Sequence, residues 1–541
     1  MKPGKDSSLK TQFTGRHRQP FSFNKVAICG LVLAFVSLSC AIGVLDQNDP
    51  LFNAPNSVGL WSPTPSINFP TDRPMLTETI DPPTSGILPL STDIQTPASV
   101  PVDSAPLLYY TQAGDTLPVV AIRFGVEASE ISSPSGSLPP TGLLNPNTLL
   151  IIPHKLVNTT SSAKIIPDSE VVYSPSAIDF DVEAYIMNAG GYLSTYREWL
   201  GTTQWTSGAE IVQRIASENS INPRLLLALL EYQGGWVYGQ PSNPMQEDYP
   251  MGKVDLALKG LYSQLAWAVN QLSVGYYGWR EGWTTDIQFS DGVSARIAPD
   301  LNSGTVAVQY YFAQVYDTPG WLGVLDTNSG ISALYEKMFG NPWLIAMEVE
   351  PLYPPNLSQP DLILPFLIGQ VWSFTGGPHG AWEREGSRAA IDFAPGSTES
   401  GCVPSNAWVV ASAPGLIVRA NHGAIVEDLD GDGNEQTGWN ILYLHVKDLK
   451  VEAGDWVETS DFLGHPSCEG GIATGTHVHI ARKYNGEWIL ADGPLPFVLS
   501  DWTVHAGSIP YDGTMTKGSD MITSSIYGAR ESLIVRTRGN P

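Results

Sequence analysis

Two histidines stand two positions apart in the segment THVHI, at His477 and His479. Residues i and i+2 of a β-strand project from the same face of a sheet. The valine and isoleucine around the pair favour a strand, and the stretch CEGGIATGT before it is typical of a loop. Both imidazoles are therefore predicted to leave one face of a strand, close enough to share one site.

Further histidines and one aspartate could complete a metal site with this pair. Six of the nine histidines fall between residues 379 and 479. Catalytic zinc sites use three protein ligands of the histidine and carboxylate type and leave one position for water. The candidate ligands are His379 in TGGPHGAW, Asp392 in AAIDFAP and one histidine of the HVH pair, while His445 lies in the apolar run ILYLHV.

The pieces GGPHG, IDFAP, LYLH and TGTHVH occur in this order in the chain. With them, residues 361–500 resemble the lysostaphin/LytM-type zinc endopeptidases, and specifically their β-lytic branch. The resemblance implies a zinc-dependent hydrolase of peptide bonds. It also implies five site residues, which are the zinc ligands His379, Asp392 and His479 and the catalytic histidines His445 and His477.

One position departs from the common pattern of that family. Many members have the first histidine four residues before the aspartate, where this chain has Arg388, which cannot bind zinc. The β-lytic branch has this histidine further upstream, in a loop similar to GGPHG. His379 fits that place.

The first 45 residues predict the cellular location of the protein. Residues 1–25 carry six Lys or Arg and one Asp, and residues 26–45 carry no charge. This uncharged segment is long enough for a membrane-spanning helix. The positive-inside rule then places residues 1–25 in the cytoplasm and exports the rest. We expect an uncleaved membrane anchor, and the alternative is a cleaved signal and secretion.

Charge and cysteine content restrict the partners and the compartment. The formal net charge of the chain is −25, which argues against nucleic acid as a partner. Two of the four cysteines, Cys29 and Cys40, lie in the apolar segment. Cys402 and Cys468 lie in the part expected to be exported, where disulfides persist, so one bridge between them is predicted.

Two regions follow the apolar segment. Residues 46–106 are rich in Pro, Ser and Thr and are expected to form an extended linker. Residues 107–154 contain GDTL, AIRFGV and a closing L-x-IP in order, and they resemble a LysM domain. This resemblance implies a small βααβ fold that binds glycan chains containing N-acetylglucosamine, such as peptidoglycan.

Residues 170–345 are predicted to be mostly helical, with one helix starting at Asn222-Pro223. Their pattern loosely resembles the lysozyme-like transglycosylase fold, in which Glu231 would be the general acid. The serine that follows this glutamate in that fold is Tyr232 here. A helical spacer or wall-binding domain is the favoured interpretation. Four tryptophans are expected in its core: Trp205, Trp236, Trp267 and Trp279.

The C-terminal part begins after a Pro-rich linker at residues 346–366. Residues 367–515 show short strands and glycine turns, which predict an all-β antiparallel metallopeptidase domain. Residues 516–541 are expected to be a C-terminal tail. The fold class is thus multidomain α+β, with a LysM module, a helical middle domain and an all-β peptidase domain.

The segment DLDGDGNEQTG, from Asp428 to Gly438, partly matches a calcium-binding loop, with three alternating aspartates and Gly433 next. The bidentate glutamate expected at position twelve of such a loop is Trp439 here. An acidic hairpin turn is the favoured interpretation, and calcium binding is the alternative. The aspartates are Asp428, Asp430 and Asp432.

These expectations describe an extracytoplasmic peptidoglycan hydrolase. Its cofactor is Zn²⁺, its LysM-like module binds wall glycan, and its N-terminal segment binds the membrane. One alternative is a wall-binding scaffold or hydrolase activator without catalysis. Another is additional glycan cleavage by the middle domain.

Overall fold

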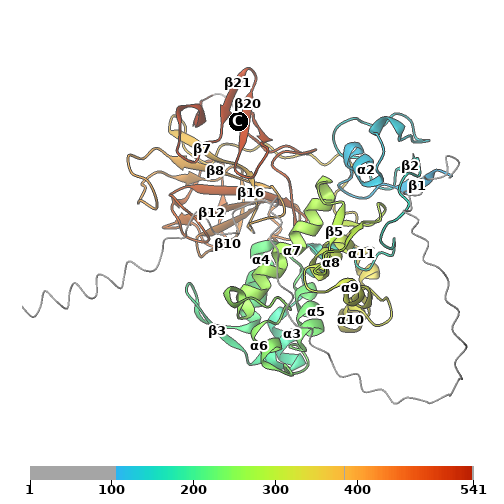
Figure 1. Ribbon diagram of the computed structural model, residues 1–541. Helices are drawn as coiled ribbons and strands as arrows, with labels where there is room; N and C mark the ends of the chain where they lie inside the picture. The colour runs from blue at the N-terminus through green and yellow to red at the C-terminus, as the bar shows by residue number, and fades with distance from the viewer. Residues whose placement is uncertain (1–104, 383, 539–541) are drawn as a thin grey trace, which may run out of the picture. The chain divides into compact units, whose positions relative to one another are not determined.

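The computed structural model describes residues 105–382 and 384–538, and it contains both helices and antiparallel sheets, as expected (Figure 1). The basic segment, the proposed anchor and nearly all of the Pro-rich linker lie outside the described residues. Within the part that is described, no helix combines the length and the apolar character needed to cross a membrane.

The first described unit is a strand, a helix, a 3₁₀ turn and a second strand. Strand β1 (Leu107–Tyr110) pairs antiparallel with β2 (Leu149–Ile152). Helix α2 (Leu117–Phe124) starts where the Thr116 side chain accepts a hydrogen bond from the Val119 N–H, and it ends at Gly125 in the left-handed conformation. The second helix implied by the LysM resemblance is a single 3₁₀ turn, η1 (Ala128–Glu130).

Helices dominate the region between residues 164 and 347. Helix α4 starts with a capping box between Ser207 and Glu210, and α5 starts at the predicted Asn222-Pro223 pair. The helices are α3 (Val182–Ala189), α4 (Gly208–Asn219), α5 (Pro223–Gly234), α6 (Pro244–Asp248), α7 (Leu261–Glu281), α8 (Ser303–Ala313), α9 (Thr318–Val324), α10 (Ile331–Phe339) and α11 (Pro342–Ala346). Two short hairpins join them, β3 (Arg197–Leu200) with β4 (Gln204–Ser207), and β5 (Asp286–Gln288) with β6 (Ser294–Arg296).

The four tryptophans expected in the helical core do not all lie there. Trp236 and Trp279 are buried, and Trp267 is half-buried against the core. Trp205 is 62 % exposed, so that expectation is wrong. It lies on the β3–β4 hairpin, where its ring packs edge-on against the equally exposed Trp199.

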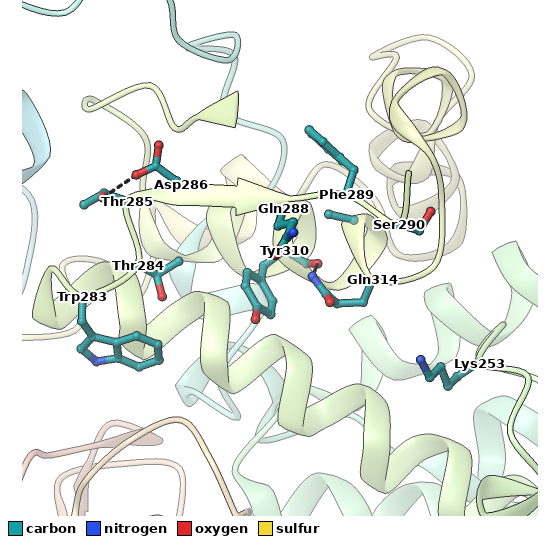
Figure 2. Close-up of a pocket in the computed structure, with 11 residues that line it drawn as sticks. Lys253, Trp283, Thr284, Thr285, Asp286, Gln288, Phe289, Ser290, Tyr310 and Gln314 are labelled. Atoms are coloured by element: carbon teal, nitrogen blue, oxygen red, sulfur yellow. Dashed lines mark hydrogen bonds between the residues drawn. The ribbon is translucent and has the colours of Figure 1, made fainter. Parts of the chain in front are cut away.

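The helical region contains a polar cavity of about 580 Å³. Figure 2 shows Tyr310 of α8, Gln314 directly after this helix, and Gln288 of β5 among the residues that line the cavity. Asp286 is the one carboxylate in its lining. The remaining lining residues are Lys253, Trp283, Thr284, Thr285, Phe289, Ser290 and Ala313.

The C-terminal part is built from antiparallel strands, and its largest sheet has the order β14-β10-β11-β12-β16-β8-β7-β22, with β17 paired to β16 (Figure 1). Its strands are β7 (Val371–His379), β8 (Ala390–Pro395), β10 (Gly415–Asn421), β11 (Ala424–Asp428), β12 (Trp439–Leu444), β14 (Trp456–Val457), β16 (Val478–Tyr484), β17 (Glu487–Trp488) and β22 (Leu533–Val535). Two smaller sheets contain β13 (Val446–Lys447), β15 (Phe462–Pro466) and β9 (Val409–Val410), and β18 (Val498–Leu499), β19 (Trp502–Ala506), β20 (Gly513–Lys517) and β21 (Asp520–Thr523).

Both faces of the large sheet are buried, because side chains alternate between two cores. The cross-strand pair Val426 and Leu442 joins the core that contains the helices. The next pair, Ile425 and Tyr443, points into the core on the other face. The helical region and the strands therefore share one apolar core.

A buried arginine links the same two regions. Arg280 of α7 forms an ion pair with Glu487 of β17 at 2.8 Å and with Asp168 at 3.2 Å. Its guanidinium also donates to the Ala113 carbonyl of the first unit. One cation thus contacts three segments that are far apart in the sequence.

The segment expected to be a C-terminal tail is part of the fold. Residues 513–523 form β20 and β21, and β22 pairs with β7 at the edge of the large sheet. Ile534 of β22 is buried in the core of that sheet, which explains why this stretch is ordered into a strand.

Candidate metal centre

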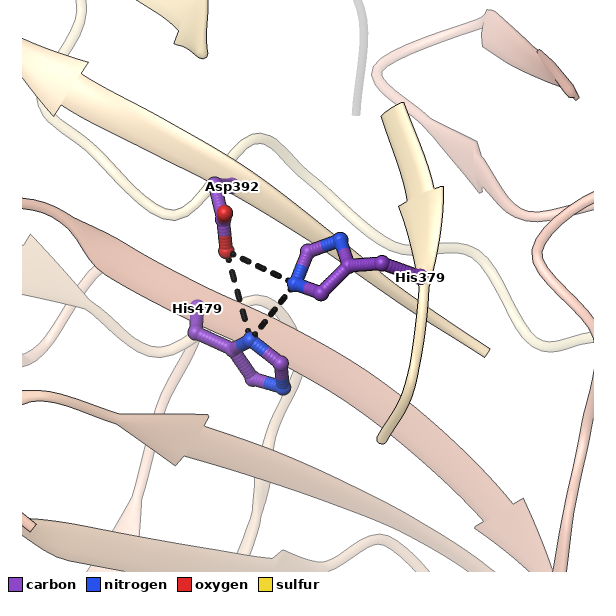
Figure 3. A group of neighbouring side chains, drawn as sticks. All are labelled: His379, Asp392 and His479. Atoms are coloured by element: carbon purple, nitrogen blue, oxygen red, sulfur yellow. Dashed lines mark hydrogen bonds and ion pairs between the residues drawn. The ribbon is translucent and has the colours of Figure 1, made fainter. Parts of the chain in front are cut away.

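Three neighbouring strands bring together His379, Asp392 and His479. His379 ends β7, Asp392 lies in β8, and His479 lies in β16 directly opposite Asp392. The Nε2 atom of His379 lies 3.0 Å from Nδ1 of His479 and 3.3 Å from Oδ1 of Asp392. Nδ1 of His479 lies 3.2 Å from the same oxygen. Figure 3 shows these three atoms pointing at one another from the three strands.

Backbone carbonyls fix both imidazole rings. Nδ1 of His379 lies 2.8 Å from the Gly377 carbonyl, and Nε2 of His479 lies 2.8 Å from the Ala381 carbonyl. A carbonyl only accepts, so each of these nitrogens carries the ring hydrogen in the neutral imidazole. The opposite nitrogens, which face Asp392, then hold lone pairs.

The three converging atoms therefore have no proton to share when both imidazoles are neutral. Oδ1 of Asp392 is buried and has no hydrogen-bond donor among the described residues. Burial alone would raise the pKa of Asp392, but the positive charge that His379 and His477 carry when protonated holds it well below its usual range. Three buried lone-pair donors around one point fit a metal ion, and two nitrogens with one carboxylate oxygen are ligands that zinc accepts.

His445 and His477 lie beside this group, as the sequence predicts. Nδ1 of His477 donates to the Gly475 carbonyl at 2.7 Å, and Nε2 lies 3.6 Å from Oδ1 of Asp392. The ring of His445 lies 4.5 Å from that of His477, and its Nδ1 donates to the Glu469 carbonyl at 2.8 Å. All five residues implied by the family resemblance thus meet at one place.

His445 is held in an unusual backbone conformation. It follows β12 with a φ of 64°, a value that residues other than glycine adopt rarely. Burial, together with the nearby His477 and His479, lowers the pKa of His445 to about 3. The residue is therefore neutral near pH 7 and has its Nε2 lone pair available.

Sequence reasoning misses one aromatic residue at the site, Tyr511. Its ring stacks on His379 with the centroids 4.1 Å apart. Burial and the charge of Asp392 raise the pKa of its hydroxyl to about 12. Tyr511 lies in the loop between β19 and β20, in a segment with no motif, so only the folded chain reveals its position.

The predicted disulfide between Cys402 and Cys468 is present, with the two Cα atoms 5.8 Å apart. Each half of the bridge lies next to a loop that holds a site histidine. Glu469, whose carbonyl accepts from His445, follows Cys468. Gly401, before Cys402, accepts a hydrogen bond from the Thr476 N–H, next to His477. The bridge therefore ties together the supports of His445 and His477.

Glu231, the hypothetical general acid, lies in the last turn of α5. Its Oε2 accepts the backbone N–H groups of Val237 at 2.9 Å and of Tyr238 at 3.0 Å. It is absent from the lining of the cavity in Figure 2. These contacts show Glu231 holding the chain that follows α5, and its catalytic role stays a hypothesis.

Comparison with known proteins finds relatives that are peptidases. Residues 164–355 match the family described as LasA, N-terminal domain. The chain is similar to protease LasA of Pseudomonas aeruginosa, with 24 % identity over 393 residues that cover 65 % of this chain and 80 % of LasA. The beta-lytic metalloendopeptidase of Achromobacter lyticus is 26 % identical over 158 residues, which are 28 % of this chain and 40 % of that protein.

A solved structure is also similar to part of this chain. The M23 metalloprotease pseudoalterin, from the deep sea, is 23 % identical with a TM-score of 0.27, and the match covers 31 % of this chain and 96 % of pseudoalterin. The expected similarity to beta-lytic metalloendopeptidases is confirmed by the sequence match. The LysM resemblance of residues 107–154 stays a prediction.

Proposed function

We propose that this protein is a zinc-dependent endopeptidase that cleaves peptide bonds in the stem peptides or cross-bridges of peptidoglycan. The observation that carries the proposal is the convergence of His379, Asp392 and His479. Their three facing atoms are buried electron-pair donors, and the two rings are oriented by carbonyls before any metal arrives. Similarity to metalloendopeptidases supports the same reaction class.

His379, Asp392 and His479 would hold the zinc ion. When bound in such a site, zinc supplies Lewis acidity and lowers the pKa of water. The protein contributes fixed ligand orientation, because Gly377 and Ala381 restrain the two imidazoles. Tyr511 covers one face of the His379 ring.

His445 and His477 would handle protons during the reaction. Each donates its Nδ1 hydrogen to a backbone carbonyl, which leaves Nε2 free to accept a proton from the attacking water or to return it to the leaving amine. In its protonated form the His477 ring can also stabilise the oxyanion that develops on the scissile carbonyl. The two rings lie close enough to share these tasks.

The remaining regions would direct the enzyme to its substrate. Residues 107–154 would bind wall glycan through the LysM-like module, and the N-terminal segment would hold the protein at the outer face of the cytoplasmic membrane. Both expectations rest on the sequence. A wall-binding scaffold would need neither metal nor turnover, and the complete set of five site residues favours an enzyme.

Zinc content and reaction products of the full chain test the proposal. We expect one zinc ion per chain and the release of new amino termini from purified peptidoglycan, with the cut bond identified by mass spectrometry of the muropeptides. Glu231→Gln is the matched control, and it should release the same peptides. Zinc-free protein that binds peptidoglycan without products would establish the scaffold, and reducing ends that disappear in Glu231→Gln would establish glycan cleavage.

A further inference from the structure

A second group of metal-ligating side chains lies in the hairpin between β11 and β12. One carboxylate oxygen from each of Asp428, Asp430 and Asp432 lies within 4.8 Å of the others. The hairpin precedes β12, and His445 follows β12, so the two groups lie roughly 20 Å apart at the usual rise of a strand. This group is therefore separate from the histidine site.

The backbone of the hairpin already folds around Asp428. The buried carboxylate accepts backbone N–H groups of Asp430, Gly431 and Gly433. Each carboxylate oxygen keeps further lone pairs, and those of the three aspartates face one another. Aspartates at alternate positions followed by glycine form the first half of calcium-binding loops.

A second observation points to a ligand, and it comes from the neighbouring strand. Asn440 lies directly opposite Asp428 in the β11–β12 pair, so both side chains leave the same face of the sheet. Its Nδ2 donates to the Thr437 carbonyl at 2.7 Å, so the amide group is held at the end of the hairpin. The side chain is fully buried, yet its Oδ1 has no hydrogen-bond donor among the described residues. Asn440 directly follows Trp439, the position at which a calcium-binding loop would have its bidentate glutamate.

The charges of the three aspartates are not balanced by lysine or arginine side chains of the described residues. Glu435, in the same hairpin, pairs with both Arg419 and Lys483 at 3.1 Å. Within residues 105–382 and 384–538, no Lys or Arg forms an ion pair with the three aspartates. Burial and the neighbouring Asp428 and Asp432 raise the pKa of Asp430 to about 6, as expected for crowded carboxylates.

We propose that the hairpin from Asp428 to Asn440 binds one calcium ion through the three aspartates and the Asn440 amide oxygen. An all-oxygen donor set selects a hard cation, and a hairpin in which two of the four ligands are exposed suits the flexible coordination of calcium better than the rigid octahedron of magnesium. The bound ion fixes the turn that begins β12, the strand that leads to His445. This proposal takes the calcium-binding alternative for the segment in place of an acidic turn without an ion.

Direct titration of the full, zinc-loaded chain in calcium-free buffer tests this site. Isothermal titration with CaCl₂ should show one ion per chain with a Kd of roughly 10⁻⁵ to 10⁻³ M, the range of moderate and weak calcium loops. Terbium offers a second probe, because the Trp456 ring lies against Gly431 in the hairpin and can sensitise terbium luminescence. Calcium should displace the terbium, and magnesium should do so only at much higher concentration.

Variants locate the ion. Asp430 and Asp432 are exposed, so Asp430→Asn with Asp432→Asn should fold, retain zinc and weaken calcium binding by at least about a hundredfold. Glu452→Gln, which removes an exposed carboxylate elsewhere in the same domain, is the matched control and should bind as the wild type does. If the wild type shows neither a heat of calcium binding nor sensitised terbium emission, the proposal is overturned. Unchanged affinity in the double variant would overturn it too, because the ion would then bind elsewhere.

Discussion

The histidine site draws its three candidate ligands from three strands, whereas the aspartate hairpin draws three of its four proposed ligands from five consecutive residues. His379 and His479 are 100 residues apart in the chain and are buried, and a carbonyl restrains each ring. Asp430 and Asp432 are exposed, and they are held by hydrogen bonds within their own turn. The same sheet thus presents one rigid donor set and one adaptable donor set.

The difference in burial and rigidity suits the two sites to different metal ions. Buried nitrogen donors in fixed orientation suit a tightly held catalytic zinc ion with defined geometry. Partly exposed carboxylates in a turn suit an exchangeable calcium ion whose affinity depends on the number of charges. The two sites should therefore respond independently to mutation.

The largest effect is expected from His479→Ala. Removing one of three ligands should abolish stoichiometric zinc binding and lower muropeptide release on the order of a thousandfold or more. Elemental analysis and product mass spectrometry measure both. Calcium titration of the same variant should match the wild type, and full zinc content in it would show that the ligands are assigned wrongly.

His445→Ala and His477→Ala should each retain zinc and reduce turnover by about a hundredfold, because these rings act on protons and charge during the reaction. Zinc analysis and initial rates on purified peptidoglycan check the two parts separately. Wild-type rates in both variants would remove these histidines from the mechanism.

Replacing Cys402 and Cys468 together by serine should lower the free energy of unfolding by about 2 kcal/mol. Turnover should also fall, because the bridge lies between the loops that position His445 and His477. Denaturant titration measures the stability. Calcium affinity should not change, and alkylation of Cys402 and Cys468 themselves in the unreduced wild type, identified by peptide mapping, would contradict the bridge.

The smallest effect is expected from Asp430→Asn without calcium. Removing one of three crowded carboxylates should stabilise the folded protein by about 0.5 kcal/mol, the scale of an exposed charge interaction. With saturating calcium the order should reverse, since the wild type gains binding energy that the variant lacks. Melting temperatures at both calcium concentrations measure this, and the same order in both conditions would argue against a shared ion.

Local patterns in the sequence predict the parts of both sites that are local. The i, i+2 spacing identifies the strand of His479, which His477 directly precedes, and alternating aspartates identify the hairpin. Tyr511, by contrast, stacks on His379 from a loop far along the chain, and Asn440 completes the hairpin only through cross-strand pairing. Contacts of this kind depend on register and topology, which single-sequence patterns do not determine.

The same reason explains the errors in the fold. β22 joins the sheet because Ile534 is buried beside β7, and a segment of three residues is too short for its sequence to predict this contact. Trp205 is exposed because the β3–β4 hairpin turns it outward, although tryptophan is usually buried. In both cases tertiary packing overrides the preference of the residue or segment.

The Arg280 ion pairs couple the folding and unfolding of the helices to those of the strands. The Arg280 guanidinium contacts Ala113, Asp168 and Glu487 and so closes long loops of the chain. These contacts should therefore form late in folding and limit the folding rate. Once formed, they make the helices and the strands one cooperative unfolding unit. A protease that removed the helices would leave Glu487 without its cation and uncover the apolar face around Val426, Leu442 and Trp488. Such a fragment should aggregate unless another surface replaces the helices.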